Sequence, residues 1–479
     1  MLGCLCAGCT FVLIEIVGLM LKFILNAKPL ETELNPAEVA LDFVRKNKGL
    51  KGTKEGCREG DCGACSVLVG TLTDSGMSYQ VQASCLLPLG ALHGKHLVTI
   101  EGLNAKEGLS LIQQALVEEG ATQCGFCTPG IVMALTGFLL NSSELSVDDA
   151  ITAMEGNICR CTGYSAIRRA ALRLVECLPE LPAPGTERIT AMVNISLLPP
   201  FFMEAAEQLA EIDPLPDSQN GVVVSGGTDL FVQQPDVLLS KRLKFVDDAA
   251  GHIYLKDEKI VIAASTTAEE LMNSTLMQRY FTDWQDGFKL MASSMIRARA
   301  TVAGNIVNAS PIGDISIMLL AVGASLKLGS NGLVRELKLE DFYRGYKQLA
   351  LQDGEIVEAI VVPLPDPGSK FSFEKVSKRE HLDIASVNSA LLINYDGAKI
   401  SSVRMSAGGV GPIPTLLRKT AESLLGKPLD SASVSFAVDT ALKEISPISD
   451  VRGSSDYKRV LLGRLITAHF IKLFSGVME

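Results

Sequence analysis

Four cysteines near the start of the chain have a spacing that could hold a metal cluster. They follow C-x4-C-x2-C spacing, and the fourth comes after nineteen further residues; they are Cys57, Cys62, Cys65 and Cys85. Thiolates in this pattern are typical ligands of a plant-type [2Fe-2S] cluster. A structural zinc site is the alternative, but such sites usually show two C-x2-C pairs, and this group has one. The group therefore predicts an iron–sulfur cluster.

A second group offers four more thiolates in two short pairs, with 31 residues between the pairs. Its members are Cys124, Cys127, Cys159 and Cys161. This group favours a second cluster, because a C-x-C pair would be strained as a chelate for one zinc in a short loop. Disulfides are disfavoured because cysteine clustering in a chain without a convincing export signal indicates metal ligation in a reducing, cytoplasmic compartment.

The segments around the two groups predict different supporting folds. Short strands over residues 21–26, 66–72 and 96–103, with a helix over 39–47, indicate a β-grasp arrangement for the first group. Helical apolar spacing over 109–120, 130–140 and 164–178 indicates a small helical domain, with the second group in loops at helix ends, and SVDD (146–149) offers an N-cap before another helix. We expect Cys177 in the core of that domain and His93 and His96 on the surface or in turns.

Two later segments could bind a phosphorylated cofactor. In GVVVSGGTDLFVQ (221–233), an apolar strand leads into paired glycines, where backbone N–H groups can approach a phosphate; a plain turn explains the same residues. ATVAGNIVNASPIGD (300–314) is interpreted as a second polar, Gly-containing loop, whose uncharged and acceptor groups suit a ribityl chain, an adenosine or a pyrophosphate; a turn-rich strand junction is the alternative. These groups belong to Thr301, Gly304, Asn305, Ser310 and Asp314.

Length and composition exclude several classes of protein. The chain of 479 residues suggests three or four domains, and 47% hydrophobic with 20% charged residues is an ordinary globular composition. A formal charge of -10 makes nucleic acid an improbable partner and provides no polybasic membrane patch. The apolar stretch 11–21 contains Glu15 and is too short to span a bilayer comfortably, so we expect no membrane segment. Residues 1–19, with Cys4, Cys6 and Cys9, are interpreted as an N-terminal extension.

The motifs EGCREGDCGAC, QCGFCTPG and NICRCTGY together resemble the two iron–sulfur domains of the xanthine dehydrogenase and aldehyde oxidase family of molybdenum hydroxylases. The resemblance implies a multidomain α+β fold: a β-grasp [2Fe-2S] ferredoxin domain, a four-helix [2Fe-2S] domain, an α+β FAD-binding domain and a C-terminal α+β flavoprotein domain. The expected limits are 1–19 for the extension, 20–102, 103–180, 181–194 for a linker, 195–368 and 369–479.

By the same resemblance, both later segments line FAD. The implied contacts are Val223, Val224, Ser225, Gly226, Gly227, Thr228, Asp229, Leu230, Thr301, Val302, Ala303, Gly304, Asn305, Asp314 and Lys375. The first cysteine group would bind the cluster nearer the flavin, and the second group the cluster nearer the molybdenum. Met291 stands where many family members place an aromatic residue beside the flavin.

The implied function is electron relay, with no acid–base catalyst in this chain. A molybdopterin-binding large subunit would oxidise hypoxanthine and xanthine to urate, and two [2Fe-2S] clusters would pass the electrons to FAD and on to NAD+. The expected assembly is a heterotetramer of two small and two large subunits. Two alternatives stay open: a reductase subunit for another azaheterocycle or aldehyde hydroxylase, and a non-enzymatic iron–sulfur or zinc protein acting as a sensor.

Overall fold

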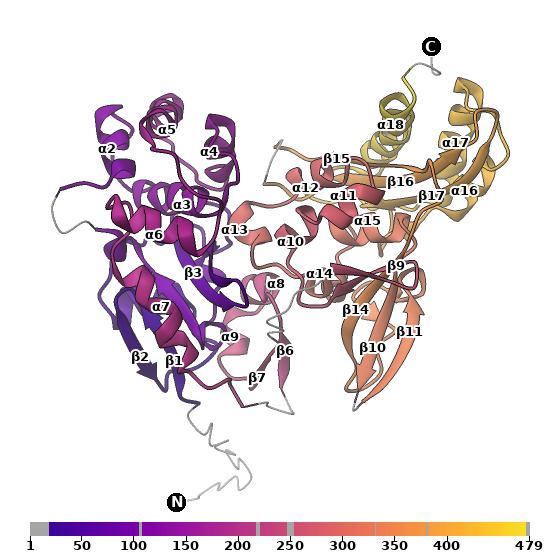
Figure 1. Ribbon diagram of the computed structural model, residues 1–479. Helices are drawn as coiled ribbons and strands as arrows, with labels where there is room; N and C mark the ends of the chain where they lie inside the picture. The colour runs from indigo at the N-terminus through magenta and orange to yellow at the C-terminus, as the bar shows by residue number, and fades with distance from the viewer. Residues whose placement is uncertain are drawn as a thin grey trace, which may run out of the picture.

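The computed structural model describes residues 19–104, 108–216, 221–246, 253–330, 332–379 and 382–475. The three cysteines of the N-terminal extension lie outside the described residues. Two halves lie side by side in Figure 1, with helices α8 (Thr228–Gln233) and α13 (Ser294–Arg297) between them. Among the helices of the described residues, none has the length and apolar character needed to cross a bilayer.

The N-terminal unit is a five-stranded mixed sheet in the order β2-β1-β5-β3-β4, with β1 and β5 parallel. Successive side chains point to opposite faces, so Phe23 and Val67 pack into one core while Ile24 and Leu68 pack into another. This arrangement confirms the α+β prediction. Its elements are β1 (Leu21–Leu25), β2 (Lys28–Thr32), β3 (Ser66–Thr73), β4 (Gly76–Ala83), β5 (Lys95–Val98), α1 (Ala40–Asp42) and a π-helical turn at Phe43–Asn47.

Four helices form the layer above this sheet (Figure 1). The second predicted segment, 130–140, is apolar on all sides because its helix is buried between the sheet and its neighbouring helices. Ser110 caps α2 through a capping box with Gln113. Ser146 caps α4, as the sequence predicted. Cys177 is exposed at the end of α5, so its placement in the core was wrong. The helices are α2 (Leu111–Glu118), α3 (Thr128–Asn141), α4 (Val147–Ala153) and α5 (Ser165–Cys177).

The expected linker contains helix α6 (Thr186–Asn194), which α7 (Phe201–Ala210) follows. Arg188 is buried there and donates hydrogen bonds to the carbonyls of Leu139 and Ser142. This tertiary anchoring overrides the Pro-rich local composition.

His96 is fully buried, which contradicts the surface position expected for it. Its Nε2 donates to the Asn26 carbonyl at 2.8 Å, and its Nδ1 accepts from the Tyr79 hydroxyl at 2.7 Å. The rings of Phe201 and Phe202 on α7 cover it. The covering helix lies a hundred residues away in the sequence, so the local pattern around His96 could not reveal its burial.

The flavin-type unit combines a two-stranded parallel pair, β6 and β7, with a five-stranded antiparallel sheet in the order β11-β10-β14-β9-β8. Helix α15 is buried along its whole length and lies at the centre of this core. The strands are β6 (Val222–Val224), β7 (Leu243–Phe245), β8 (Ile253–Lys256), β9 (Lys259–Ala263), β10 (Ser325–Ser330), β11 (Leu333–Lys338), β12 (Tyr343–Gly345), β13 (Gln348–Leu349) and β14 (Ile356–Pro363). Besides α8 and α13, the helices are α9 (Pro235–Leu238), α10 (Ala268–Met272), α11 (Thr275–Tyr280), α12 (Trp284–Lys289), α14 (Val302–Asn308) and α15 (Asp314–Ala321).

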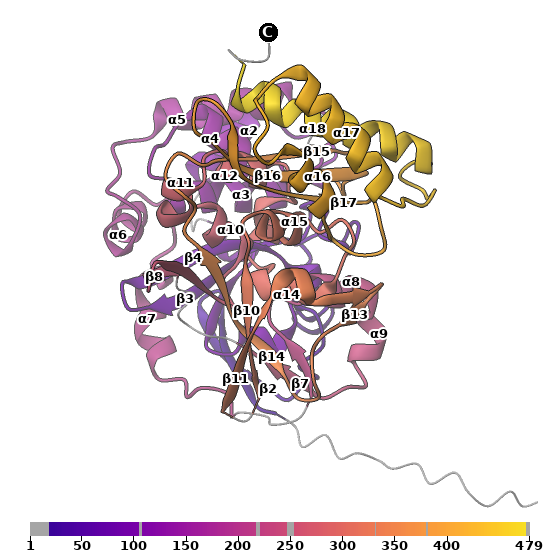
Figure 2. The same ribbon diagram turned by 90° about the vertical axis from the view of Figure 1, so that its right-hand side faces the viewer.

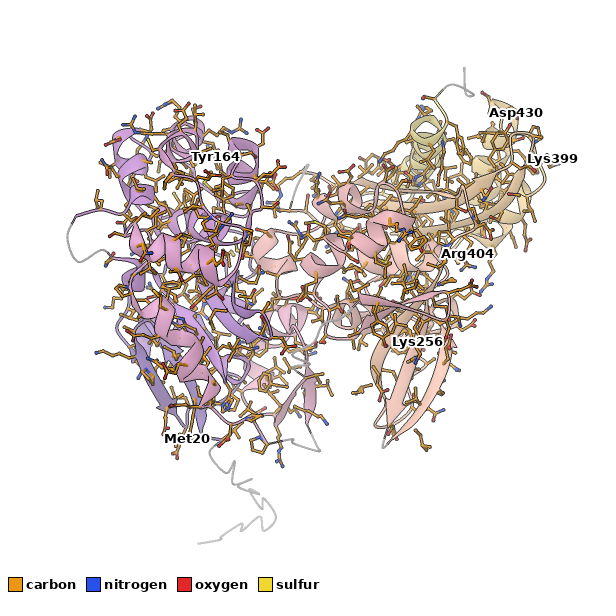
Figure 3. All side chains as sticks on the ribbon, viewed as in Figure 1. Met20, Tyr164, Lys256, Lys399, Arg404 and Asp430 are labelled. Carbon is orange, nitrogen blue, oxygen red and sulfur yellow. The ribbon has the colours of Figure 1, made fainter. Side chains whose placement is uncertain are left out.

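The C-terminal unit is an antiparallel sheet, β15-β16-β17-β18, covered by helices that Figure 2 shows at the top of the molecule. Asp430, labelled in Figure 3, caps α17 by accepting from the Ser433 amide. The long helix α18 was not anticipated from the sequence. The elements are β15 (Lys370–Val376), β16 (Val387–Tyr395), β17 (Ile400–Gly408), β18 (Thr415–Leu416), α16 (Arg418–Leu424), α17 (Ser431–Glu444) and α18 (Ser455–Leu473).

Candidate functional site

The first cysteine group lies in the loop before β3 and at the end of β4, and its thiols form two hydrogen-bonded pairs. Cys57 pairs with Cys62, and Cys65 pairs with Cys85. The second pair is buried, whereas the first is partly exposed. The hydrogen bond from Cys62 lowers the pKa of Cys57 to about 5, and the same bond raises the pKa of Cys62. In each pair, one thiol therefore loses its proton more readily than a free cysteine does. A bound metal ion can take the place of that proton and neutralise the negative charge of the thiolate.

Backbone N–H groups surround the sulfur of Cys57. The amides of Glu59 and Asp61 each donate to Cys57 Sγ at 3.3 Å. Gly60, between them, has a φ of +77°, which favours glycine. At Gly56 a Cβ would lie 2.6 Å from Cys62 Sγ, so the loop passes too close to the sulfur for any side chain. These donors stabilise a thiolate and suit a cluster sulfur environment.

The second cysteine group also forms two pairs, but one pair faces solvent. Cys124 and Cys161 are exposed with their sulfurs 3.5 Å apart, while Cys127 and Cys159 are buried. Burial raises the pKa of Cys127 to about 12, and the hydrogen bond between it and Cys159 acts in the same direction. The hydroxyl of Tyr164, at the start of α5 in Figure 3, accepts from the Cys159 amide at 3.0 Å.

Each group thus presents two pairs of thiols, which is the donor set that two irons with two thiolates each require. Within the part of the chain that the structure describes, no three His, Cys, Asp or Glu side chains are arranged so that they could hold a single metal ion. The residues present fit a dinuclear iron–sulfur cluster at each group.

The two cysteine loops contact each other through backbone. The Ile158 amide donates to the Cys62 carbonyl at 3.0 Å, and the Asn157 side chain donates to the Gly63 carbonyl at 2.9 Å. At Gly63 a Cβ would lie 2.8 Å from the Cα of Asn157, so glycine is needed for this approach. One hydrogen bond therefore joins Cys62 of the first group to the residue that precedes Cys159 of the second.

The segment expected to bind phosphate runs from β6 into α8. Gly227 has a φ of +75°, and Val224 is buried beneath the turn. A Cβ at Gly226 would overlap the backbone carbonyl of Arg299. The turn therefore lies directly against the residues that precede Thr301, which brings the two predicted segments together.

The second predicted segment is a helix start where we expected a loop. Thr301 caps α14, and its hydroxyl accepts from the Gly304 amide at 3.2 Å. Val302 and Ala303 pack inward, so their side chains serve the core. Asn305 accepts from the Ser316 hydroxyl at 3.3 Å, which connects α14 to the start of α15.

Asp314 and Lys375, both expected at the cofactor, form a buried ion pair of 2.8 Å. Lys375 also donates to the Leu290 carbonyl at 2.8 Å, and Asn388 donates to the other carboxylate oxygen of Asp314. The pair joins the flavin-type unit to β15 and β16 of the C-terminal unit. Asn305 is hydrogen-bonded to α15, and α15 begins at Asp314. The ion pair therefore lies at the far end of the row of predicted residues that begins at Gly226.

Sequence reasoning missed polar side chains beside this row. In the described residues, three buried side-chain oxygens there have no hydrogen-bond partner: Ser265 Oγ, Thr266 Oγ1 and Asn388 Oδ1. Thr266 and Thr301 are adjacent, because the Val302 amide donates to the Thr266 carbonyl. Orphaned buried oxygens fit a polar cofactor. The Ser-Thr-Thr run after β9 was the available signal.

A cavity of about 600 Å³ separates the first cysteine loop from α8 and α9. Cys57 and Cys85 line one side, and Phe231 and Val232 line the other. Arg58 also lines it, and its guanidinium binds Asp42 and Glu55, which holds the loop in place. The first cysteine group is thus the one that faces the flavin-type unit.

Four family models match the chain in order. They are described as a 2Fe-2S iron-sulfur cluster binding domain (residues 23–89), a [2Fe-2S] binding domain (99–172), an FAD binding domain in molybdopterin dehydrogenase (197–365) and a CO dehydrogenase flavoprotein C-terminal domain (372–473).

Curated relatives and a solved structure resemble the chain over different lengths. It is 28% identical to xanthine dehydrogenase of Blastobotrys adeninivorans, over 93% of this chain and 40% of that protein. It is 26% identical to the nicotinate hydroxylase of Emericella nidulans, over 92% of this chain and 40% of that protein. A crystal structure of the Cu,Mo-CO dehydrogenase in its cyanide-inactivated form matches with 25% identity and a TM-score of 0.50, covering 52% of this chain and 88% of that chain. The chain spans about 40% of the length of these curated relatives.

Proposed function

Because the chain belongs to the molybdenum hydroxylase family, as its iron–sulfur and FAD part, we propose that it passes electrons from a molybdopterin-binding partner subunit to NAD+ during the oxidation of hypoxanthine and xanthine to urate. Each hydroxylation releases two electrons. When bound, the clusters carry electrons singly, and FAD, which is stable in one- and two-electron states, collects them and passes them on as a pair.

We propose specific ligands for each group. Cys57, Cys62, Cys65 and Cys85 hold the first cluster; Cys124, Cys127, Cys159 and Cys161 hold the second. FAD lies along residues 223–230 and 301–305, with Asp314 and Lys375 at the far end of that row. The proposed domain limits are those expected from the sequence: 20–102, 103–180, 195–368 and 369–479.

The contact between the two cysteine loops is the observation that carries this proposal. Ile158 donates to the Cys62 carbonyl, so the two clusters would sit on loops that share a hydrogen bond. The first loop in turn faces the flavin-type unit across the cavity lined by Cys57 and Cys85. An ordered series, second cluster to first cluster to flavin, follows from these neighbours.

The exposed edge of the second group supports a partner at that end of the series. Phe126 is 45% exposed and Ile158 is 46% exposed, beside the exposed sulfurs of Cys124 and Cys161. Apolar side chains around a ligand pair suit a protein surface that excludes water. We propose that the molybdopterin-binding subunit docks here, in a heterotetramer of two small and two large subunits.

A reductase for another azaheterocycle hydroxylase is the second candidate. The nicotinate hydroxylase of Emericella nidulans is nearly as similar to this chain as the xanthine dehydrogenase of Blastobotrys adeninivorans. Substrate choice would lie on the partner, so this chain carries no residue that separates the two candidates.

Turnover of the complex would separate them. The chain would be purified together with its molybdopterin partner and mixed with xanthine or nicotinate, and NADH formation would be followed. The proposal predicts NADH formation with xanthine. NADH formation with nicotinate alone would establish the second candidate, and flavin that NADH does not reduce would contradict NAD+ as the acceptor.

A further inference from the structure

We infer that residues 293–300, the α13 segment, position both cysteine loops against the flavin-binding segments, with Met295 and Ile296 as the positioning residues. The inference rests on the proposed function, and it assigns a positioning role to side chains that bind neither cluster nor flavin. Figure 1 shows α13 where the two halves of the molecule meet.

Met295 touches both cysteine loops. Its Sδ lies 3.7 Å from the hydroxyl of Ser66, the residue after Cys65. A Cβ at Gly156 would overlap its terminal methyl group, and Gly156 ends the turn that follows α4, three residues before Cys159. Met295 is almost fully buried, so this one flexible side chain fills the space between the two loops.

Ile296 covers the middle of the first loop. A Cβ at Gly60 would overlap the Ile296 δ-methyl group. The Gly60 amide also donates a hydrogen bond to the Cys85 sulfur. The isoleucine therefore packs at the point where the loop offers a backbone donor to a ligand sulfur.

The other end of the segment is tied to the flavin-type unit. Arg297 is buried and donates to Glu269 at 2.7 Å and to the carbonyls of Met291 and Ala292 at 3.0 and 2.8 Å. The Ala300 carbonyl accepts from the Ala268 amide at 2.8 Å. These bonds fix the register of the segment within its own unit.

The segment then runs into the predicted cofactor contacts. The Arg299 carbonyl lies against Gly226, and Thr301 begins α14. A short stretch of chain thus contacts the loop of each cysteine group at one end and both flavin-binding segments at the other. Because electron tunnelling weakens steeply with separation, any looseness in this stretch changes the rates between centres.

The test compares Met295→Ala with Met295→Leu in the full chain. Met277→Ala is the matched control. Met277 is a buried methionine of the same unit, and the hydrophobic core cluster to which it belongs includes no residue of either cysteine loop. Hydrogen–deuterium exchange of residues 57–66 and 156–162, electron paramagnetic resonance (EPR) of the dithionite-reduced clusters, and iron and flavin content are measured for each.

We expect the backbone amides of both segments to exchange roughly tenfold faster in Met295→Ala than in the wild type, because most of the buried side chain that packs between them is removed. Its EPR signals should broaden, and reduction of the clusters by NADH should slow several-fold while reduction of FAD by NADH stays unchanged. Met295→Leu should behave like the wild type, and Met277→Ala should leave both segments unchanged. Ile296→Ala should speed exchange in residues 57–66 alone, which serves as a second test where Met295→Ala folds poorly.

Normal iron and flavin with unchanged exchange and EPR signals in both Met295→Ala and Ile296→Ala would overturn the inference and leave the proposed function standing. Absence of iron and flavin from the wild-type chain would instead overturn the proposed function.

Discussion

The two cysteine loops have the same donor set but differ in exposure. Each has one buried pair of thiols, but the first keeps its other pair, Cys57 and Cys62, half-buried, and it faces the flavin-type unit with Ile296 over Gly60. The second keeps Cys124 and Cys161 exposed. A centre that passes electrons within one chain can be surrounded by that chain, whereas a centre that receives them from another protein needs an open edge. The difference in burial agrees with the proposed order, in which electrons enter at the second loop and pass to the first.

Removing one ligand from each loop tests this difference with the largest expected effect. Cys124→Ser and Cys65→Ser should each lower the iron content by about two atoms per chain. Cys124→Ser should block electron flow from the partner and leave NADH oxidation by an artificial acceptor at FAD intact. Iron analysis and the two activities check this.

Cys177→Ser is the matched control, because Cys177 is exposed and belongs to neither group. It should keep the full iron content and both activities. If Cys124→Ser keeps them as well, the assignment of the second cluster is wrong.

Breaking the Asp314–Lys375 pair tests the flavin end of the series. Lys375→Met leaves the carboxylate of Asp314 buried without its cation, so we expect the free energy of unfolding to fall by about 3–5 kcal/mol. Denaturant unfolding and bound flavin are measured. Lys289→Met, which removes an exposed pair with Asp286, should change the free energy by about 0.5 kcal/mol or less. Equal effects of the two substitutions would show that burial of the pair contributes nothing.

The sheet under the first loop should be sensitive to acid. Burial lowers the pKa of His96 from 6.5 to about 4. The folded state then binds fewer protons than the unfolded state, so stability is present above pH 6.5 and is lost as the pH falls toward 4, by at most about 3 kcal/mol. The unfolding free energy of His96→Gln should depend less on pH in this window than that of the wild type. His93→Gln should retain the wild-type slope, and an identical slope in all three would contradict the burial of a neutral His96.

The hydrogen bond between the loops should have the smallest effect on stability. Asn157→Ala removes one donor to the buried carbonyl of Gly63, which still accepts from the Ser66 hydroxyl, so the free energy of unfolding should fall by only about 1 kcal/mol. Asn141→Ala is the control, because Asn141 donates a similar bond to the Tyr79 carbonyl away from both loops. Only Asn157→Ala should change the EPR signals of the clusters. A change in neither variant would mean that this contact does not hold the two centres in place.

The sequence allowed prediction of features that depend on near neighbours. Cysteine spacing identified both groups, apolar periodicity located α2, α3 and α5, and Ser146 was recognised as a helix cap. The α+β fold and the cluster and flavin domains were confirmed by the family models. Each of these signals lies within a few residues, or within one motif, of the structure that it specifies.

Features set by distant contacts could not be predicted. The burial of His96 depends on Phe201 and Phe202, and the partner of Asn157 lies 94 residues away at Gly63. Met295 looks like an ordinary core residue until the fold places it between two loops from other units. The start of α14 was read as a loop because its polar residues conceal the Thr301 cap.

The most direct test of the relay is the visible absorption spectrum of the purified chain, with iron, acid-labile sulfide and released flavin measured per polypeptide. The account predicts about four irons and four sulfides, as two [2Fe-2S] clusters require, and about one FAD. Zinc in place of iron, with no flavin, would contradict it and make the chain a structural metal protein.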